Sequence, residues 1–140
     1  MKSFKALVAF ALVAFVMVSC AKVEKILPKN DGLWNVTTLN VKTYVDGTLD
    51  SDTTYNNNGT MMFSEDGTGV ITDAADSTST FAWAANDDND MVTITQDGLA
   101  VTYEVVESKK DAQEWMGSYE IDLGLFGVIR TDFDLKMERP

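Results

Sequence analysis

Short segments of alternating apolar and polar residues fill the chain from residue 31 to its end. The last segment is the clearest, because Ile129, Thr131, Phe133, Leu135 and Met137 each follow or precede a charged residue. A period of two is typical of a strand with one buried face, since successive side chains point to opposite sides of a sheet. The pattern predicts an all-β domain without a persuasive helical repeat.

The same alternation predicts a series of strands upstream. In the first segment the apolar positions shift from Trp34 and Val36 to Leu39 and Val41, which predicts a β-bulge at residues 37–38. The expected strands cover residues 33–45, 48–55, 60–64, 68–73, 79–85, 91–95, 99–107, 113–121 and 129–137.

Asp-Gly pairs separate several of these segments. Asp46-Gly47, Asp66-Gly67 and Asp97-Gly98 each lie between two alternating segments. This pair tolerates the positive φ angles of a tight hairpin turn, so short antiparallel connections are expected. About eight or nine such strands would leave exposed edges as a flat sheet, and closure removes them. The sequence predicts one small antiparallel up-and-down β-barrel over residues 31–140.

A different pattern occupies the N-terminus. Lys2 and Lys5 accompany an unbroken apolar run over residues 6–18, which ends at Ser19 and Cys20. As a helix the run would rise only ~20 Å, short of the ~30 Å hydrocarbon core, so it predicts a signal peptide and not a membrane span. The Ser-Cys ending resembles a bacterial lipobox, which implies removal of residues 1–19 and attachment of lipid, including palmitate, to Cys20. The alternative is an ordinary secretory leader with Cys20 as a free thiol.

Charge is distributed unevenly along the chain. From Asp31 onward there are 21 acidic and 6 basic residues, and a surface this negative repels phosphate backbones, so nucleic acid is not an expected partner. Residues 20–30, with Lys22, Lys25 and Lys29, are expected to form a tether between the lipid and the domain. The favoured interpretation is a solvated linker, and the alternative is contact of the lysines with anionic headgroups.

Several motifs resemble a known family in their order. Gly32-Leu33-Trp34 is similar to the Gly-x-Trp signature in the first strand of lipocalins. The order of segments 63–69, 81–83, 92–95 and 103–105 resembles the small lipocalin-like domains of lipoproteins from Bacteroidetes-type bacteria. The resemblance implies a lipocalin-like barrel over about residues 31–139, with an arginine packed over Trp34, for which Arg130 and Arg139 are candidates. It implies no particular ligand.

Candidate chemistry is sparse. The chain contains no histidine, which removes the commonest general base and every imidazole metal site. Asp87, Asp88 and Asp90 cluster in one expected loop, but the glycine and distal glutamate of a calcium loop are missing. No catalytic residue, metal site or cofactor is therefore predicted. An enzyme would need carboxylates or tyrosines that only the fold brings together.

Large aromatic residues fall mostly at the inward positions of the predicted strands. Each buries ~150–250 Å², so a filled core is favoured over a ligand-binding lumen. A pocket of at least ~300 Å³ would favour ligand binding instead. The candidate core or ligand-lining residues are Trp34, Phe81, Trp83, Tyr103, Trp115, Tyr119 and Phe133.

Three large apolar residues, Leu123, Leu125 and Phe126, lie among glycines between the last two expected strands. In the favoured interpretation Leu123 and Leu125 continue the alternation of Tyr119 and Ile121 into the core. In the alternative they form an exposed loop that contacts a partner or a membrane.

These features together predict a non-catalytic binding or interaction module that is lipid-anchored in the cell envelope and meets another envelope protein. Ala21 after the cysteine is compatible with sorting to the outer membrane of a Gram-negative bacterium. The alternative function is a carrier of a small apolar ligand inside the barrel. A carboxylate-dependent envelope enzyme is a third and weaker hypothesis.

Overall fold

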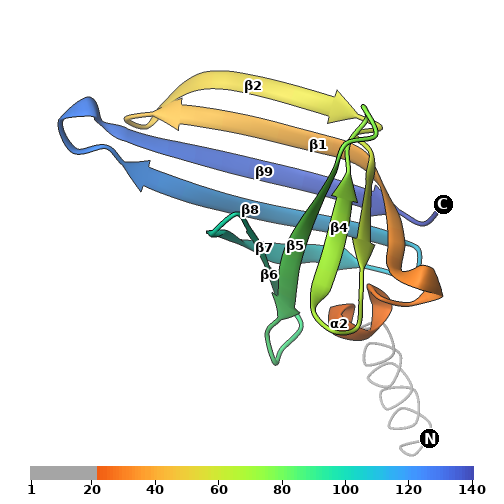
Figure 1. Cartoon of the computed structure of the whole chain (residues 1–140). Helices are drawn as coiled ribbons and strands as arrows, with labels where there is room; N and C mark the ends of the chain where they lie inside the picture. The colour runs from red at the N-terminus through yellow and green to blue at the C-terminus, as the bar shows by residue number, and fades with distance from the viewer. Residues whose placement is uncertain (1–21) are drawn as a thin grey trace, which may run out of the picture.

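A computed structural model describes residues 22–140, which form an all-β domain as predicted (Figure 1). Every predicted strand matches an observed strand to within one residue at each end. Cys20 and the leader lie outside the described residues. The elements are α2 (Val23–Ile26), η1 (Asn30–Gly32), β1 (Leu33–Val45), β2 (Thr48–Asn56), β3 (Thr60–Phe63), β4 (Thr68–Thr72), β5 (Thr78–Ala85), β6 (Met91–Gln96), β7 (Leu99–Ser108), β8 (Ala112–Asp122), η2 (Gly124–Phe126) and β9 (Val128–Glu138).

Eight of the strands close an antiparallel barrel. The hydrogen-bonded order is β1-β3-β4-β5-β6-β7-β8-β9, and β9 pairs with β1 to close the ring. β2 stays outside, because it pairs with residues 38–45 of β1 whereas β3 pairs with residues 33–35. The expected uninterrupted meander is therefore broken at β2. All residues of β2 are exposed, so the strand has no apolar face to place against a core.

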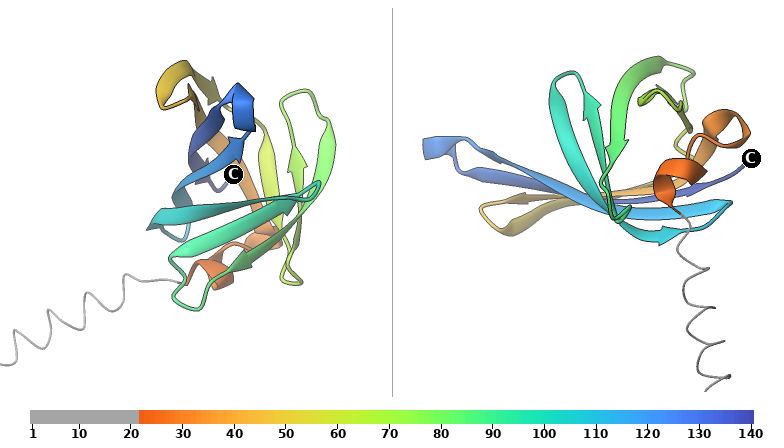
Figure 2. Two further views of the ribbon diagram at one scale, coloured as in Figure 1. Left: turned by 90° about the vertical axis from the view of Figure 1, so that its left-hand side faces the viewer. Right: turned by 90° about the horizontal axis from the view of Figure 1, so that it is seen from below.

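The longest strands run beyond the barrel (Figure 2). β1, β8 and β9 have 13, 11 and 11 residues, whereas β3 has 4. Past the barrel they continue, with β2, as a four-stranded sheet in the order β2-β1-β9-β8. This sheet, called the arm below, comprises β2, residues 38–45 of β1, 117–122 of β8 and 128–135 of β9. Its tip lies at the opposite end of the molecule from α2 (Figure 1).

Bulges and turns follow the sequence closely. The bulge predicted at residues 37–38 is confirmed by a register shift between Val36 and Thr38 in the β1–β9 pairing. Asp46-Gly47 and Asp97-Gly98 have positive φ at both residues, as expected of tight hairpin turns. Asp66-Gly67 differs, because only Gly67 has positive φ and the Asp66 carboxylate instead accepts hydrogen bonds from the Thr68 N–H and hydroxyl.

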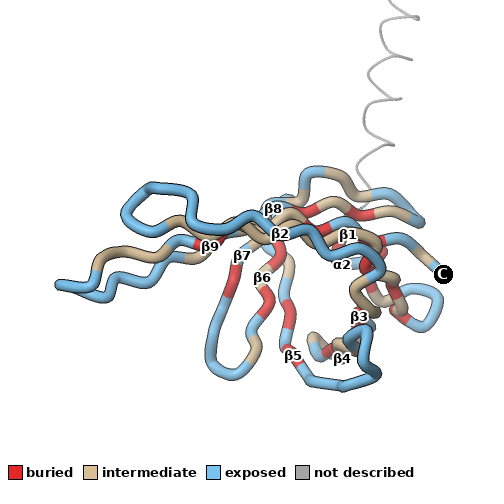
Figure 3. The backbone as a smooth tube through the Cα atoms, turned by 90° about the horizontal axis from the view of Figure 1, so that it is seen from above, coloured by how far each residue is buried: buried red, intermediate tan, exposed pale blue. Residues whose placement is uncertain are grey.

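The core fills the barrel, whereas most residues of the arm are half-buried or exposed (Figure 3). Phe63 lies at its centre and packs edge-on against the rings of Phe81, Trp83 and Trp115, with centroids 5.3–5.9 Å apart. Such edge-to-face pairs stabilise a core beyond the burial of their area. The buried core residues are Val23, Ile26, Leu27, Trp34, Val36, Met61, Phe63, Phe81, Trp83, Val92, Ile94, Trp115, Leu135 and Met137.

The packed structure begins earlier than the sequence suggested. Residues 20–30 were expected to form a tether, with a solvated linker favoured, yet Val23, Ile26 and Leu27 are buried in the core. The short helix α2 turns these side chains inward and leaves Glu24, Lys25 and Lys29 exposed. One end of the barrel needs a cover for its apolar interior, and this segment supplies it. We call residues 22–32 the cap.

Trp34 and Arg139 join the cap to the barrel. The Trp34 indole N–H donates to the Leu27 carbonyl over 3.0 Å, and the Arg139 guanidinium lies 3.9 Å from the ring centre of Trp34. Arg139 also donates to the carbonyls of Ile26 and Leu33. Of the two arginines considered for this position, Arg139 is the one over the tryptophan, whereas Arg130 lies over Tyr44 in the arm.

We expect Leu27→Ala to lower the free energy of unfolding by ~2–5 kcal/mol, because the side chain is fully buried under the barrel end. The matched control is Lys25→Ala, an exposed position in the helix that Leu27 follows, with an expected change below ~0.5 kcal/mol. Urea titration of both variants measures the difference. Equal, small effects would show that residues 22–32 are a linker and not a cap.

Candidate binding cleft

The structure divides the seven candidate aromatic residues into two groups. Trp34, Phe81, Trp83 and Trp115 are buried in the half of the barrel that the cap covers, which we call the closed half. The other three are only half buried and lie where the arm leaves the barrel. These three are Tyr103, Tyr119 and Phe133. The first group is core, as the favoured interpretation held, and the second group lines a cleft.

The polar atoms of the buried tryptophans are satisfied within the protein. The Trp83 indole N–H lies 3.1 Å from both the Ser64 and the Thr68 carbonyl oxygens, and the Trp115 N–H donates to Gln113 Oε1 over 3.2 Å. Buried polar groups need such partners to avoid a desolvation penalty. These indoles therefore present no free donor to a ligand, which agrees with a structural role.

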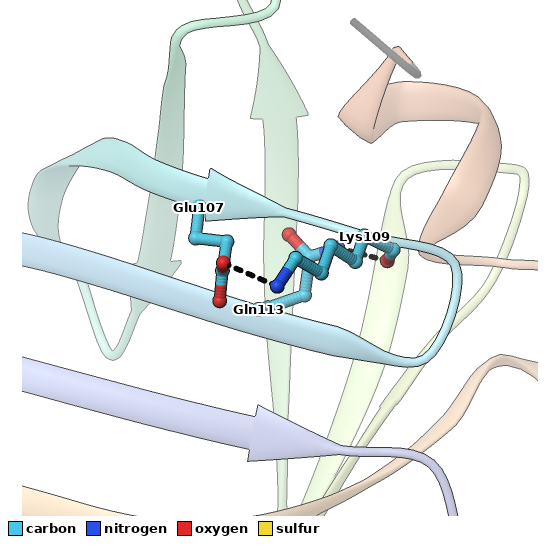
Figure 4. Close-up of polar contacts among 3 residues, drawn as sticks. All are labelled: Glu107, Lys109 and Gln113. Atoms are coloured by element: carbon cyan, nitrogen blue, oxygen red, sulfur yellow. Dashed lines mark hydrogen bonds and ion pairs between the residues drawn. The ribbon is translucent and has the colours of Figure 1, made fainter. Parts of the chain in front are cut away.

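Gln113 in turn fixes the β7–β8 turn beside the cap (Figure 4). Its Nε2 donates to the Lys109 carbonyl and to the Ser108 hydroxyl, each over 3.0 Å. The Lys109 ammonium pairs with Glu107 at 2.7 Å, and this hydrogen bond raises the pKa of Lys109 above its ordinary value. The Gln113 hydrogen bonds and the Lys109–Glu107 ion pair thus stabilise the turn at this end of the barrel.

The other end of the barrel is open. A cleft of about 460 Å³ lies between the tip of the β6–β7 hairpin and the arm. Its volume exceeds the ~300 Å³ that would favour ligand binding over a filled interior. The cleft is not a lumen, however, because one side faces solvent. The lining is mostly apolar and consists of Ile94, Gln96, Asp97, Leu99, Val101, Tyr103, Tyr119 and Phe133.

A row of neighbouring aromatic rings forms the floor of this cleft. Ring centroids lie 5.9 Å apart for Trp115 and Tyr103, 6.2 Å for Tyr103 and Phe133, and 5.8 Å for Phe133 and Tyr119. Tyr103 lies flat on Gly117, where a Cβ atom would come within 2.7 Å of the ring. Gly117 is therefore needed for the row to continue from the core onto the arm.

A second, more polar groove lies on the outer side of the same strands. It also measures about 460 Å³, and Glu104, Ser118, Arg130 and Asp132 contribute to its lining. Arg130 is paired with Asp132 at 3.1 Å. Phe133 lines both the cleft and this groove, so the two hollows meet at that ring.

The loop between β8 and β9 is exposed, which corrects the favoured interpretation of its apolar residues. β8 ends at Asp122, and Leu123, Leu125 and Phe126 do not continue its alternation into the core. Leu125 is fully exposed and Phe126 is 86% exposed at the tip of the arm. Positive φ angles at Gly124 and Gly127 turn the chain here, so the period of two is lost.

Two features of the described residues bear on metal binding and proton transfer. They contain no group of three or more metal-ligating side chains that could hold an ion. Burial raises the pKa of the Tyr103 phenol to about 12, so this phenol is a poor general base near neutral pH. Among residues 22–140, no helix has the length and apolar character needed to cross a membrane.

Comparison with known proteins gives limited likeness. No family model matches the chain, and no curated protein matches it in sequence. Lobster apocrustacyanin A1 is a solved structure that it resembles, with a TM-score of 0.40 and 10% sequence identity. The alignment covers 87% of this chain and 71% of that one. The description of the fold as lipocalin-like therefore rests on the closed eight-stranded ring and on the Trp34–Arg139 stack.

Neither the place of Leu99 in the cleft lining nor the opening of the barrel wall that creates the cleft was predicted from the sequence. Leu99 follows the Asp97-Gly98 turn directly, and a single apolar residue at a hairpin tip does not by itself mark a contact. The opening has no signal of its own, because strand alternation does not report where pairing between neighbours ends.

The Tyr103 phenol makes the free energy of unfolding fall as pH rises through the alkaline range. Its pKa is about 12 in the folded protein and about 10 when unfolded, so the unfolded state loses a proton first as pH rises. The contribution is complete below about pH 10 and is lost by about pH 12. We expect the parent to lose up to ~2–3 kcal/mol relative to Tyr103→Phe between about pH 9 and about pH 12 in urea titrations. A constant difference over this range would contradict the burial of the phenol.

Proposed function

We propose that this protein is a non-catalytic binding module of the bacterial cell envelope, anchored by lipid on Cys20, whose partner or ligand occupies the open cleft. One observation carries the binding site. The closed half of the barrel is packed with aromatic rings, whereas the cleft beside Tyr103, Tyr119 and Phe133 is apolar and open. Its volume of about 460 Å³ lies within the range of ligand sites.

The open shape favours an interaction module over a carrier that encloses its ligand. A carrier needs a desolvated cavity to gain affinity from a small apolar molecule. Here Phe63, Phe81, Trp83 and Trp115 fill the space that such a ligand would need in the closed half. A ligand in the cleft keeps one side in water. This arrangement suits a ligand that is one part of a larger partner molecule.

The N-terminal leader supports the anchor, and so does the short segment between Cys20 and the cap. Lys22 follows Cys20 by two residues, which span at most about 7 Å. A lipid on Cys20 would therefore hold the cap close to the membrane. The arm extends to the far end of the molecule, so its tip would lie far from that membrane (Figure 1). The outer membrane of a Gram-negative bacterium is the location we propose.

The anchor is tested by labelling cells of a Gram-negative host with a palmitate analogue. We expect the parent chain to carry the label and Cys20→Ala to lose it, because the thiol is the attachment atom. Ser19→Ala, which keeps a small residue before the cysteine, is the matched control and should stay labelled. An equally labelled Cys20→Ala protein would contradict the lipoprotein proposal.

The cleft is tested with the neutral apolar dye Nile red. We expect weak, saturable binding to residues 20–140 carrying Cys20→Ser, since these residues include the complete described core. Leu99→Ser should weaken it about threefold or more, because Leu99 lines the cleft.

Leu49→Ser is the control for Leu99→Ser. The two leucines are 52% and 48% exposed respectively, but Leu49 lies on β2 and is not part of the cleft lining. We expect Leu49→Ser to bind the dye like the parent. Equal loss in both variants, or no binding by the parent, would contradict a specific apolar site.

A further inference from the structure

The barrel wall is split between β7 and β8. The two strands pair from Ser108 and Gln113 as far as Tyr103 and Gly117, and no pairing continues beyond that point. Residues 99–102 of β7 remain paired with β6, and residues 118–122 of β8 remain paired with β9. Two strand edges therefore face each other without a partner, and the β6–β7 hairpin turns away from the arm (Figure 2).

The cleft and the outer groove lie on the two sides of this split. The apolar cleft includes Leu99, Tyr119 and Phe133, and the polar groove includes Thr102, Ser118 and Phe133. An extended chain places successive side chains on opposite faces. A strand in the split would thus direct every second side chain into the apolar cleft and the others toward the polar groove.

Carboxylates dominate the charge around the split. Asp97 lies in the cleft lining and Glu104 in the groove lining, and Glu120 is exposed on β8 two residues beyond Ser118. The basic residue in the groove, Arg130, is already paired with Asp132 and stacked on Tyr44. A bound strand is therefore favoured by basic side chains on its outward face.

We propose that the split accepts an extended segment of a partner protein, with alternating apolar and basic residues, which adds as a strand to residues 118–122 of β8. The inference rests on the proposed function, since it names the partner of the same cleft. Main-chain hydrogen bonds to an exposed edge supply affinity in this mode of recognition, and side-chain pockets supply specificity. The free edge of β8 offers the main-chain hydrogen bonds, and the apolar cleft and the polar groove offer the side-chain pockets.

A second copy of this chain does not fit the split. Two copies joined through β8 would bring Glu120 and Asp122 of each copy toward the same acidic edge, and opposed like charges destabilise a strand pair. β2 is the other long free edge of the arm, and it carries Asp50 and Asp52. No residue of β2 lines the cleft or the outer groove. The edge of β2 therefore lacks the two pockets that flank the split.

The test uses an end-blocked synthetic peptide of about seven residues in which valine and lysine alternate. The protein is residues 20–140 with Cys20→Ser, uniformly labelled with ¹⁵N. We expect saturable binding whose amide shift changes are confined to residues 94–104 and 116–133. A peptide of the same composition with the valines in one block, and one with alternate backbone nitrogens methylated, should each bind at least about tenfold more weakly.

Glu120→Lys should weaken binding of the alternating peptide about threefold or more, whereas Asp50→Lys on β2 should bind it like the parent. Both residues are exposed, so neither change threatens the fold. Equal binding of the methylated peptide would overturn strand addition, and shift changes over residues 48–56 would overturn the choice of edge. Nile red binding that depends on Leu99, without binding of the peptide, would overturn this inference and leave the proposed function standing.

Discussion

The contact between Arg139 and Trp34 closes the molecule at one end. Trp34 is the second residue of β1 and Arg139 directly follows β9. The same guanidinium donates to the carbonyls of Ile26 in the cap and Leu33 in β1. A cation over an indole face is favourable, most of all when water is excluded. β1 and β9 are already paired over ten residue pairs, so the role of this contact is to fix the cap to the strands that close the ring.

Closure at one end has a consequence at the other. β1, β8 and β9 are too long for the short strands β3 and β4, so they leave the barrel and carry β2 with them as the arm. The wall then separates between β7 and β8 beyond Tyr103 and Gly117. The row of rings from Trp115 to Tyr119 crosses this point, so aromatic packing continues from the core into the cleft. The aromatic row thus runs from the core at Trp115 to the arm at Tyr119.

Much of this fold could be predicted from alternation and turn residues. The strands, the bulge near residues 37–38 and the inward positions of Phe81 and Trp83 were all evident, because each depends on neighbours in sequence. The cap was not, since the four-residue helix α2 is too short to show a helical period. The exposed loop at Leu125 was only the less favoured alternative, because its spacing imitates a strand and the φ angles of Gly124 and Gly127 decide otherwise. The split depends on where pairing between distant segments ends, which no local pattern encodes.

The central claim is that the wall is open between β7 and β8 while the capped half is sealed. Amide hydrogen exchange of the free protein tests it residue by residue. We expect uniform slow exchange over residues 113–117 and alternation over residues 118–122, where amides toward β9 are protected and amides toward the split exchange fast. Uniform protection across residues 99–102 and 118–122 would show that the two edges are paired, and would contradict the account.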